Sequence, residues 1–374
     1  MSLASLHGNI SRSAPWVALL VFAVVLPLLY AGGVIDIGTL NTWGKFLAIA
    51  IMAIGLDLVW GYTGMLSLCQ ALFFTLGGYC MGMHLAMHGP LDEGIPRCLS
   101  VVSSEVGGIQ LPIFWQPFAS LWATIALVAL VPGAVAFLFG WFAFRSRVRG
   151  VYFSIITQAL TIAVWLVLCR NEMRLCGTNG LTNFVTIAGF DLRAPATKVG
   201  LYLLTVAVVA ASVVVAQWLV RTRTGRVLIA VRDNESRLRF AGYQPVAYKV
   251  WVFTVAAILG AIGGALYVPQ NGIMTPEYLV AKESVVAVVM VALGGRGTIY
   301  GAIVGALLYK YLENTLSTVL ANNWYFVLGG LIVAIVLFLP DGLVGAWRGL
   351  GRRLREREAR STAASEPAIT AVAS

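Results

Sequence analysis

Charged side chains are scarce in this sequence: Asp, Glu, Lys and Arg make up 11% of its 374 residues, and the mean hydropathy is +0.85. Soluble domains carry about 25% charged residues, and a water-soluble fold of this composition would expose more apolar surface than water tolerates. The alternating segments of about ten residues that are typical of a transmembrane β-barrel are also absent. The composition therefore excludes a soluble fold and a barrel, and it predicts an all-α integral membrane protein.

Residues that hold metals or nucleotides are also few. The three histidines, His7, His84 and His88, are scattered, and the cysteine spacing matches no metal site. The phosphate-binding pattern G-x-x-x-x-G-K-[S/T] is absent, so we expect no cofactor, and any ATP hydrolysis belongs to a separate chain. Cys98 and Cys176 fall in predicted outer loops, where they can either pair as a disulfide or stay free thiols.

Long apolar runs predict a polytopic bundle of about ten transmembrane helices, since a spanning helix needs about 20 mostly apolar residues. The candidates are 16–35, 43–60, 64–87, 118–144, 151–169, 198–220, 249–270, 284–300, 301–320 and 326–346. The eighth and ninth meet at the glycine-rich "GGRGTIYG" (294–301), which is either a turn between two spans or a break within one re-entrant unit.

The net charge of +10 is explained by membrane topology rather than by nucleic acid, because the basic residues cluster in particular loops. Most of them fall in 144–150, in the 221–249 loop and in the tail. This bias places both termini in the cytoplasm. The chain then divides into an N-terminal segment with the first span (1–42), a core (43–346) and a basic tail (347–374) that we expect to be disordered at its end.

Uncharged polar side chains interrupt two of the apolar runs, "GYTGMLSLCQALFFTLGGY" (61–79) and "YFSIITQALTIAV" (152–164). An amide that faces lipid is costly, so these groups are expected to face the bundle or a cavity. They either line a path for a small neutral solute or make hydrogen bonds between helices. The candidates for the path are Ser67, Gln70, Thr75, Thr157, Gln158 and Thr161.

The longest hydrophilic segment on the predicted cytoplasmic side is 221–249. Its apolar residues are spaced as in short amphipathic helices at the membrane surface. Asp233 or Asn234 can cap the second of these helices, and Gly242 can end it. The loop either anchors the topology as a solvated segment or docks onto a cytoplasmic partner. The candidates for coupling are Arg232, Asp233, Glu235, Arg239 and Gly242.

Ionisable residues within the predicted spans include Asp57, Lys310 and Glu313. Lys310 and Glu313 are three residues apart on a helix and can form an ion pair. A charge in mid-membrane costs about 3 kcal/mol, so these residues either serve ion-coupled transport or mark a span that surfaces near Lys310.

Five segments in order carry a family resemblance. Residues 61–79 resemble the hallmark of LivM-type permeases, the membrane subunits of branched-chain amino acid ABC importers. "GTNGLTNF" (177–184), "GGALYVPQ" (263–270), "VVMVALGGRGTIYGAIVGALL" (288–308) and "FLPDGLVG" (338–345) resemble further blocks of that family. Two other segments, "FRSRVRGVYFSIITQALT" and "RDNESRLRFAGY", are most similar to its urea-importer branch, the urea permease C subunit. The sequence departs from the family at Asp57, Cys69 and Cys176, where the family usually has asparagine, glycine and glycine.

The resemblance implies a multi-pass transport subunit of the bacterial inner membrane, not itself an enzyme. It implies a second homologous permease, two cytoplasmic ATPases that use the ATP, and a periplasmic substrate-binding protein. It also places the coupling helix at about Arg232 to Gly242. We expect urea or a close amide as the solute, because an amino acid zwitterion needs countercharges and few are available in the spans. The alternatives are a branched-chain amino acid permease of the same architecture and an ion-coupled secondary carrier.

Overall fold

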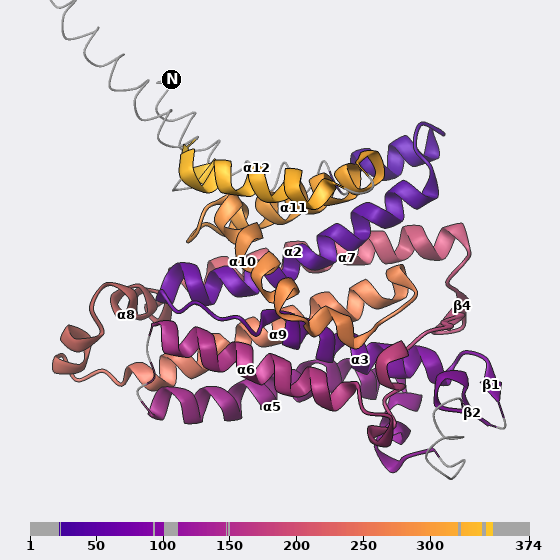
Figure 1. Ribbon diagram of the computed structural model, residues 1–374, viewed down its shortest axis with the longest axis horizontal. Helices are drawn as coiled ribbons and strands as arrows, with labels where there is room; N and C mark the ends of the chain where they lie inside the picture. The colour runs from indigo at the N-terminus through magenta and orange to yellow at the C-terminus, as the bar shows by residue number, and fades with distance from the viewer. Residues whose placement is uncertain are drawn as a thin grey trace, which may run out of the picture.

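The computed structural model describes residues 22, 24–92, 94–100, 111–146, 148, 150–320, 323–338 and 342–346. Figure 1 shows long helices stacked side by side, with α8 at one end of the stack and the strands β1, β2 and β4 at the other. We call these the α8 end and the strand end. The predicted tail 347–374 and part of the first predicted span, residues 16–21 and 23, lie outside the described residues, as do the positions of both termini.

The long helices alternate with short connections. They are α2 (Ile37–Thr63), α3 (Gln70–Met87), α5 (Leu121–Arg145), α6 (Val151–Leu168), α7 (Pro195–Arg221), α8 (Arg223–Phe240), α9 (Pro245–Asn271), α10 (Ala281–Gly294), α11 (Ile299–Val319) and α12 (Trp324–Phe338). The short 3-10 helices are η1 (Ile113–Ala119), η2 (Asn171–Met173), η3 (Gly177–Asn179) and η4 (Pro276–Leu279). Two antiparallel hairpins pair β1 (Leu91–Asp92) with β2 (Ile95–Pro96), and β3 (Thr186–Ile187) with β4 (Phe190–Asp191).

Fewer helices qualify as membrane spans than the ten predicted. Within the described residues, α2, α5, α6, α7 and α9 are long and apolar enough to cross a membrane, and a sixth span results if α10 and α11 count as one. These two helices bend by 118° at their break. With 14 residues, α10 is only about 21 Å long, which is shorter than the roughly 30 Å hydrocarbon core. The length of α10 therefore favours the re-entrant interpretation of 294–301.

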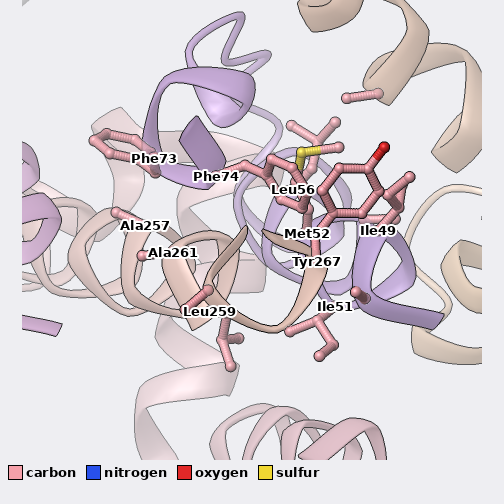
Figure 2. Packing of buried hydrophobic residues seen from close by; sticks show 14 of the residues in the cluster. Ile49, Ile51, Met52, Leu56, Phe73, Phe74, Ala257, Leu259, Ala261 and Tyr267 are labelled. Carbon is pink, nitrogen blue, oxygen red and sulfur yellow. The ribbon is translucent and has the colours of Figure 1, made fainter. Parts of the chain in front are cut away.

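Helices α2 and α9 form the centre of the bundle. In the most apolar stretch of α2, 89% of the residues are buried, and in that of α9, 72% are. The corresponding fraction is 28% in both α5 and α6. Helix α9 packs against α2, α3 and α5, and Figure 2 shows Met52 of α2, Phe74 of α3 and Tyr267 of α9, which line one cavity. The exposed side chains of α5 and α6 are largely apolar, such as Trp122, Phe142 and Ile155, as expected of surfaces that face lipid.

Glycines allow the closest helix crossings. A Cβ on Gly264 of α9 would overlap the carbonyl group of Phe74 on α3, and a Cβ on Gly77 would overlap the backbone of Ala261. Likewise, a Cβ on Gly305 of α11 would overlap the carbonyl group of Met290 on α10. Close backbone approach gives the van der Waals contact that holds helices together in lipid, so these glycines allow α9 to pack on α3 and α11 to pack on α10.

At the strand end, a disulfide and a hydrogen bond connect the loops to one another. Cys98 and Cys176 form a disulfide with a Cα–Cα distance of 5.4 Å, which resolves the alternative that the sequence left open. It connects the α3–α5 loop to the α6–α7 loop. Nearby, the buried Trp115 donates its indole N–H to the carbonyl oxygen of Arg174 at 3.1 Å. Both contacts hold the α6–α7 loop against the rest of this end.

Candidate translocation and coupling site

An unwound segment, residues 64–69, separates α2 from α3. Helix α2 ends at Gly64, whose φ of 74° lies in the left-handed region that favours glycine. The following residues reach the start of α3 at Gln70, which already lies beside Ala256 in the interior of α9. Non-helical backbone in a membrane protein survives only where other groups satisfy its N–H and C=O groups, so partners are required here.

Hydroxyl groups of α6 supply these partners. The Ser154 hydroxyl donates to the carbonyl oxygen of Leu66 at 2.8 Å, and the Leu68 N–H donates to the Thr157 hydroxyl at 3.0 Å. The Thr161 hydroxyl lies 3.2 Å from the Leu68 carbonyl oxygen. Residues 154, 157 and 161 share one face of a helix, and all three side chains are buried. Thr157 and Thr161 were predicted from the sequence, whereas Ser154 was not, although it precedes Thr157 by the three residues that put both on one helix face.

The other path candidates divide into two groups. The Gln70 amide donates to the carbonyl oxygen of Ala256 at 2.7 Å, and the Ser67 hydroxyl lies 3.2 Å from the Cys69 sulfur. In contrast, the Thr75 hydroxyl and the amide of Gln158 are buried without a hydrogen-bond partner in the described part of the chain. Ser67, Gln70, Thr157 and Thr161 thus gather around the unwound segment, and Thr75 lies farther along α3.

At the α8 end, α2 contacts the break between α10 and α11. The buried Asp57 carboxylate accepts a hydrogen bond of 2.7 Å from the Gly297 N–H. A Cβ on Gly61 would lie 2.5 Å from the Gly297 nitrogen, and the Arg296 guanidinium lies 5.4 Å from the Trp60 ring centre. Asp57 therefore connects two discontinuities of the bundle, the end of α2 and the 295–298 turn.

Helix α8 reaches the same place through Arg232, which donates to the carbonyl oxygen of Gly61 at 3.0 Å. The helix is kinked at Asn234, whose backbone is non-helical and whose side chain accepts from the Arg237 N–H at 3.0 Å. This is the N-cap arrangement that the sequence predicted at Asp233 or Asn234. Gly242, with a φ of 84°, follows the end of the second half, also as predicted.

Glu235 joins α8 to α9. Its two carboxylate oxygens pair with Arg239 at 2.7 Å and with Lys249 at 2.8 Å. The Lys249 side chain is only 7% exposed, whereas Asp233, which pairs with Arg232 at 3.3 Å, is 64% exposed. The structure thus connects Arg232 and Glu235 to the bundle, pairs Arg239 with Glu235, and leaves Asp233 at the surface.

A charged cavity lies in the half of α2 that is distant from α8. It has a volume of about 300 Å³ and is lined by Thr42, Lys45 and Ile49 of α2, Tyr267 of α9, Trp324, and Lys310, Glu313, Asn314 and Ser317 of α11, among others. The predicted ion pair between Lys310 and Glu313 is confirmed, with a distance of 2.6 Å between Nζ and Oε2.

A narrower cavity adjoins the first, because Ile49, Tyr267 and Lys310 line both. Its other lining residues include Met52, Phe74, Glu283, Val286 and Met290. Lys310 and Glu313 were singled out from the sequence, whereas Lys45, Tyr267 and Glu283 were not. On α2 and α11 the lining residues recur at the helical intervals of three, four and seven, and this spacing is visible in the sequence.

Comparisons with known proteins agree on one class, the membrane permeases of transport systems. The permease family described as "Branched-chain amino acid transport system / permease component" matches residues 38–336. The high-affinity branched-chain amino acid transport system permease protein LivM of Escherichia coli K12 is 26% identical over 350 residues, which are 88% of this chain and 74% of LivM. A probable LivM of Methanocaldococcus jannaschii is 23% identical over 79% of this chain and 89% of its own length. The ribose import permease protein RbsC of Haemophilus influenzae is 23% identical over 65% of this chain and 73% of its own. No solved structure matches.

Proposed function

Since this chain belongs to the permease family of branched-chain amino acid transport systems, we propose that it is the membrane subunit of an ATP-driven importer that carries branched-chain amino acids. The observation that carries this proposal is the family match over 38–336, which includes α2 through most of α12. The names of the LivM relatives support the alternative in the sequence analysis, branched-chain amino acids, rather than urea.

Urea was expected from the sequence because the spans offer few countercharges for an amino acid zwitterion. Lys45, Glu283, Lys310 and Glu313 surround the two adjoining cavities, so countercharges for a zwitterion are available. The geometry therefore removes the physical reason to prefer a neutral solute.

Coupling to ATP hydrolysis is proposed to act through α8. Its Arg232 contacts Gly61 at the end of α2, and Gly61 in turn abuts Gly297 in the turn between α10 and α11. Phe240, at the end of α8, is 93% exposed, as expected for an apolar residue that a partner covers. A force on α8 from a moving ATPase would therefore act directly on both discontinuities of the bundle.

The complete importer is proposed to contain a second homologous permease, two cytoplasmic ATPases and a periplasmic substrate-binding protein. The chain is proposed to lie in a bacterial inner membrane with the α8 end and both termini in the cytoplasm, and with about ten spans. Its own part is to open and close the solute path, while partner chains bind and hydrolyse ATP.

Uptake of radiolabelled L-leucine and of radiolabelled urea in a strain that lacks this chain tests the proposal. We expect the chain to restore leucine uptake, and only when the ATPase subunits are present. Urea uptake without leucine uptake would overturn the proposed substrate. Leucine uptake driven by an ion gradient in vesicles that contain this chain alone would instead support the secondary carrier.

A further inference from the structure

We infer that the two adjoining cavities between α2, α9, α10 and α11 form a binding subsite for an α-amino acid with an aliphatic side chain. The zwitterionic head would bind the charged residues of the wider cavity together with Glu283, and the side chain would extend among the apolar residues of the narrower cavity. This inference rests on the proposed function and deepens it, because it assigns the recognition of substrate to particular residues of this chain.

Lys45 is suited to bind the substrate carboxylate. It lines the wider cavity, and no carboxylate of the described residues lies within ion-pair distance of it. Lys310 of α11, which also lines this cavity, is already paired with Glu313. A carboxylate can therefore bind Lys45 without breaking an existing ion pair, and such charge-assisted hydrogen bonds are about twice as strong as neutral ones.

Two acidic residues are suited to bind the substrate ammonium group. Glu313 uses Oε2 for Lys310, and no bond to its other carboxylate oxygen is found within the described residues. Glu283 lines the narrower cavity beside Lys310. Charges of both signs at this depth are costly in a membrane and mark a functional region, and the two cavities present both signs to a ligand that carries both.

The narrower cavity supplies the apolar part of the subsite. Met52, Phe74, Val286 and Met290 line it, and Figure 2 shows Met52 and Phe74 beside Tyr267, with Ile49 next to them. The Phe74 and Tyr267 rings are 5.4 Å apart, and the Tyr267 hydroxyl is 3.1 Å from that of Tyr278. An aliphatic side chain gains about 0.8 kcal/mol for each CH₂ group that it buries there, whereas urea has neither charges nor an apolar group to offer.

The periplasmic binding protein has a selectivity of its own, which uptake measurements include. The subsite is therefore tested by asking whether a ligand protects a thiol introduced beside the cavity. Asn314 is exposed and lines the wider cavity. In membranes that contain the assembled importer with Asn314→Cys, we expect L-leucine to slow labelling by a membrane-impermeant maleimide. Leucinamide, 4-methylpentanoate and urea should each need a concentration about tenfold higher or more for the same protection, because each lacks at least one charge of the zwitterion.

Charge-removing variants make the test specific. Lys45→Met should raise the leucine concentration for half-protection by about tenfold or more, and Lys45→Arg should keep most of the protection. Lys198→Met is the matched control, because Lys198 lies on α7 and lines neither cavity. Copurification of the partner subunits shows that each variant assembles.

The outcomes separate the two proposals. Equal protection by leucine in the Lys45→Met and Lys198→Met variants, or equal protection of the parent by urea and leucine, would overturn the subsite. If the importer transports leucine and the thiol at 314 is never protected, the subsite is wrong and the proposed function stands. If the importer transports no branched-chain amino acid, the proposed function is wrong.

Discussion

The guanidinium of Arg232 donates a hydrogen bond of 3.0 Å to the carbonyl oxygen of Gly61, 171 residues earlier in the chain. The last carbonyls of a helix lack partners within it and carry partial negative charge, so the end of α2 is a natural site for a cation. Through this bond, α8 holds the last turn of α2. Gly61 in this turn abuts Gly297, and Asp57, four residues earlier, accepts a hydrogen bond from the Gly297 N–H.

Replacing Arg232 should uncouple ATP hydrolysis from transport. In the reconstituted importer, we expect Arg232→Ala to lower leucine uptake per ATP hydrolysed about fivefold or more, the lower end of typical coupling energies. Arg226→Ala is the control, because Arg226 is an exposed residue of the same helix. An unchanged ratio in Arg232→Ala would show that the contact with Gly61 transmits no force.

Removing the charge of Glu235 should destabilise the protein. Glu235 and its partner Lys249 are 12% and 7% exposed, and a buried charge that loses its partner costs about 3 kcal/mol or more. We therefore expect Glu235→Gln to lower the melting temperature in detergent, whereas Asp233→Asn at the surface changes it little. The double variant Glu235→Gln/Lys249→Met should melt above the single variant, since it also removes the buried ammonium that faced Glu235. Additive losses in the double variant would contradict the ion-pair explanation.

The hydroxyl of Thr157 should be required for the stability of the unwound segment. Thr157→Val removes the acceptor of the Leu68 N–H, and a buried donor without a partner costs about 2 kcal/mol. Thr254→Val is the matched control, because that hydroxyl bonds to Val250 of its own helix. We expect thermal melting and proteolysis near residues 64–69 to change only in Thr157→Val. Equal effects of the two variants would mean that the segment needs no support from α6.

The disulfide predicts the number of free thiols. When thiols are blocked during lysis and the protein is denatured, mass spectrometry should find three modified cysteines, Cys69, Cys80 and Cys169. Reduction before modification should raise the number to all five. Five modified cysteines without a reductant would contradict the pairing of Cys98 with Cys176.

Local chemistry made parts of the site predictable from the sequence. The cap at Asn234, the end at Gly242 and the ion pair between Lys310 and Glu313 each involve residues a few positions apart, so helix spacing alone predicts them. The disulfide stayed open because Cys98 and Cys176 are 78 residues apart, and nothing in their surroundings says whether the two loops meet.

The sequence by itself determined that this chain is an apolar, helical membrane protein, because hydropathy acts over short distances along the chain. Only the tertiary structure decided that residues 64–69, predicted as part of a span, are unwound, and what the interruptions of the bundle contact. Ser154 supports a backbone 88 residues away, Gly297 meets Asp57, and Lys45 shares a cavity with Glu313. These relations depend on how α2, α6 and α11 cross, and crossings are set by close packing between distant helices rather than by the residues of any one of them.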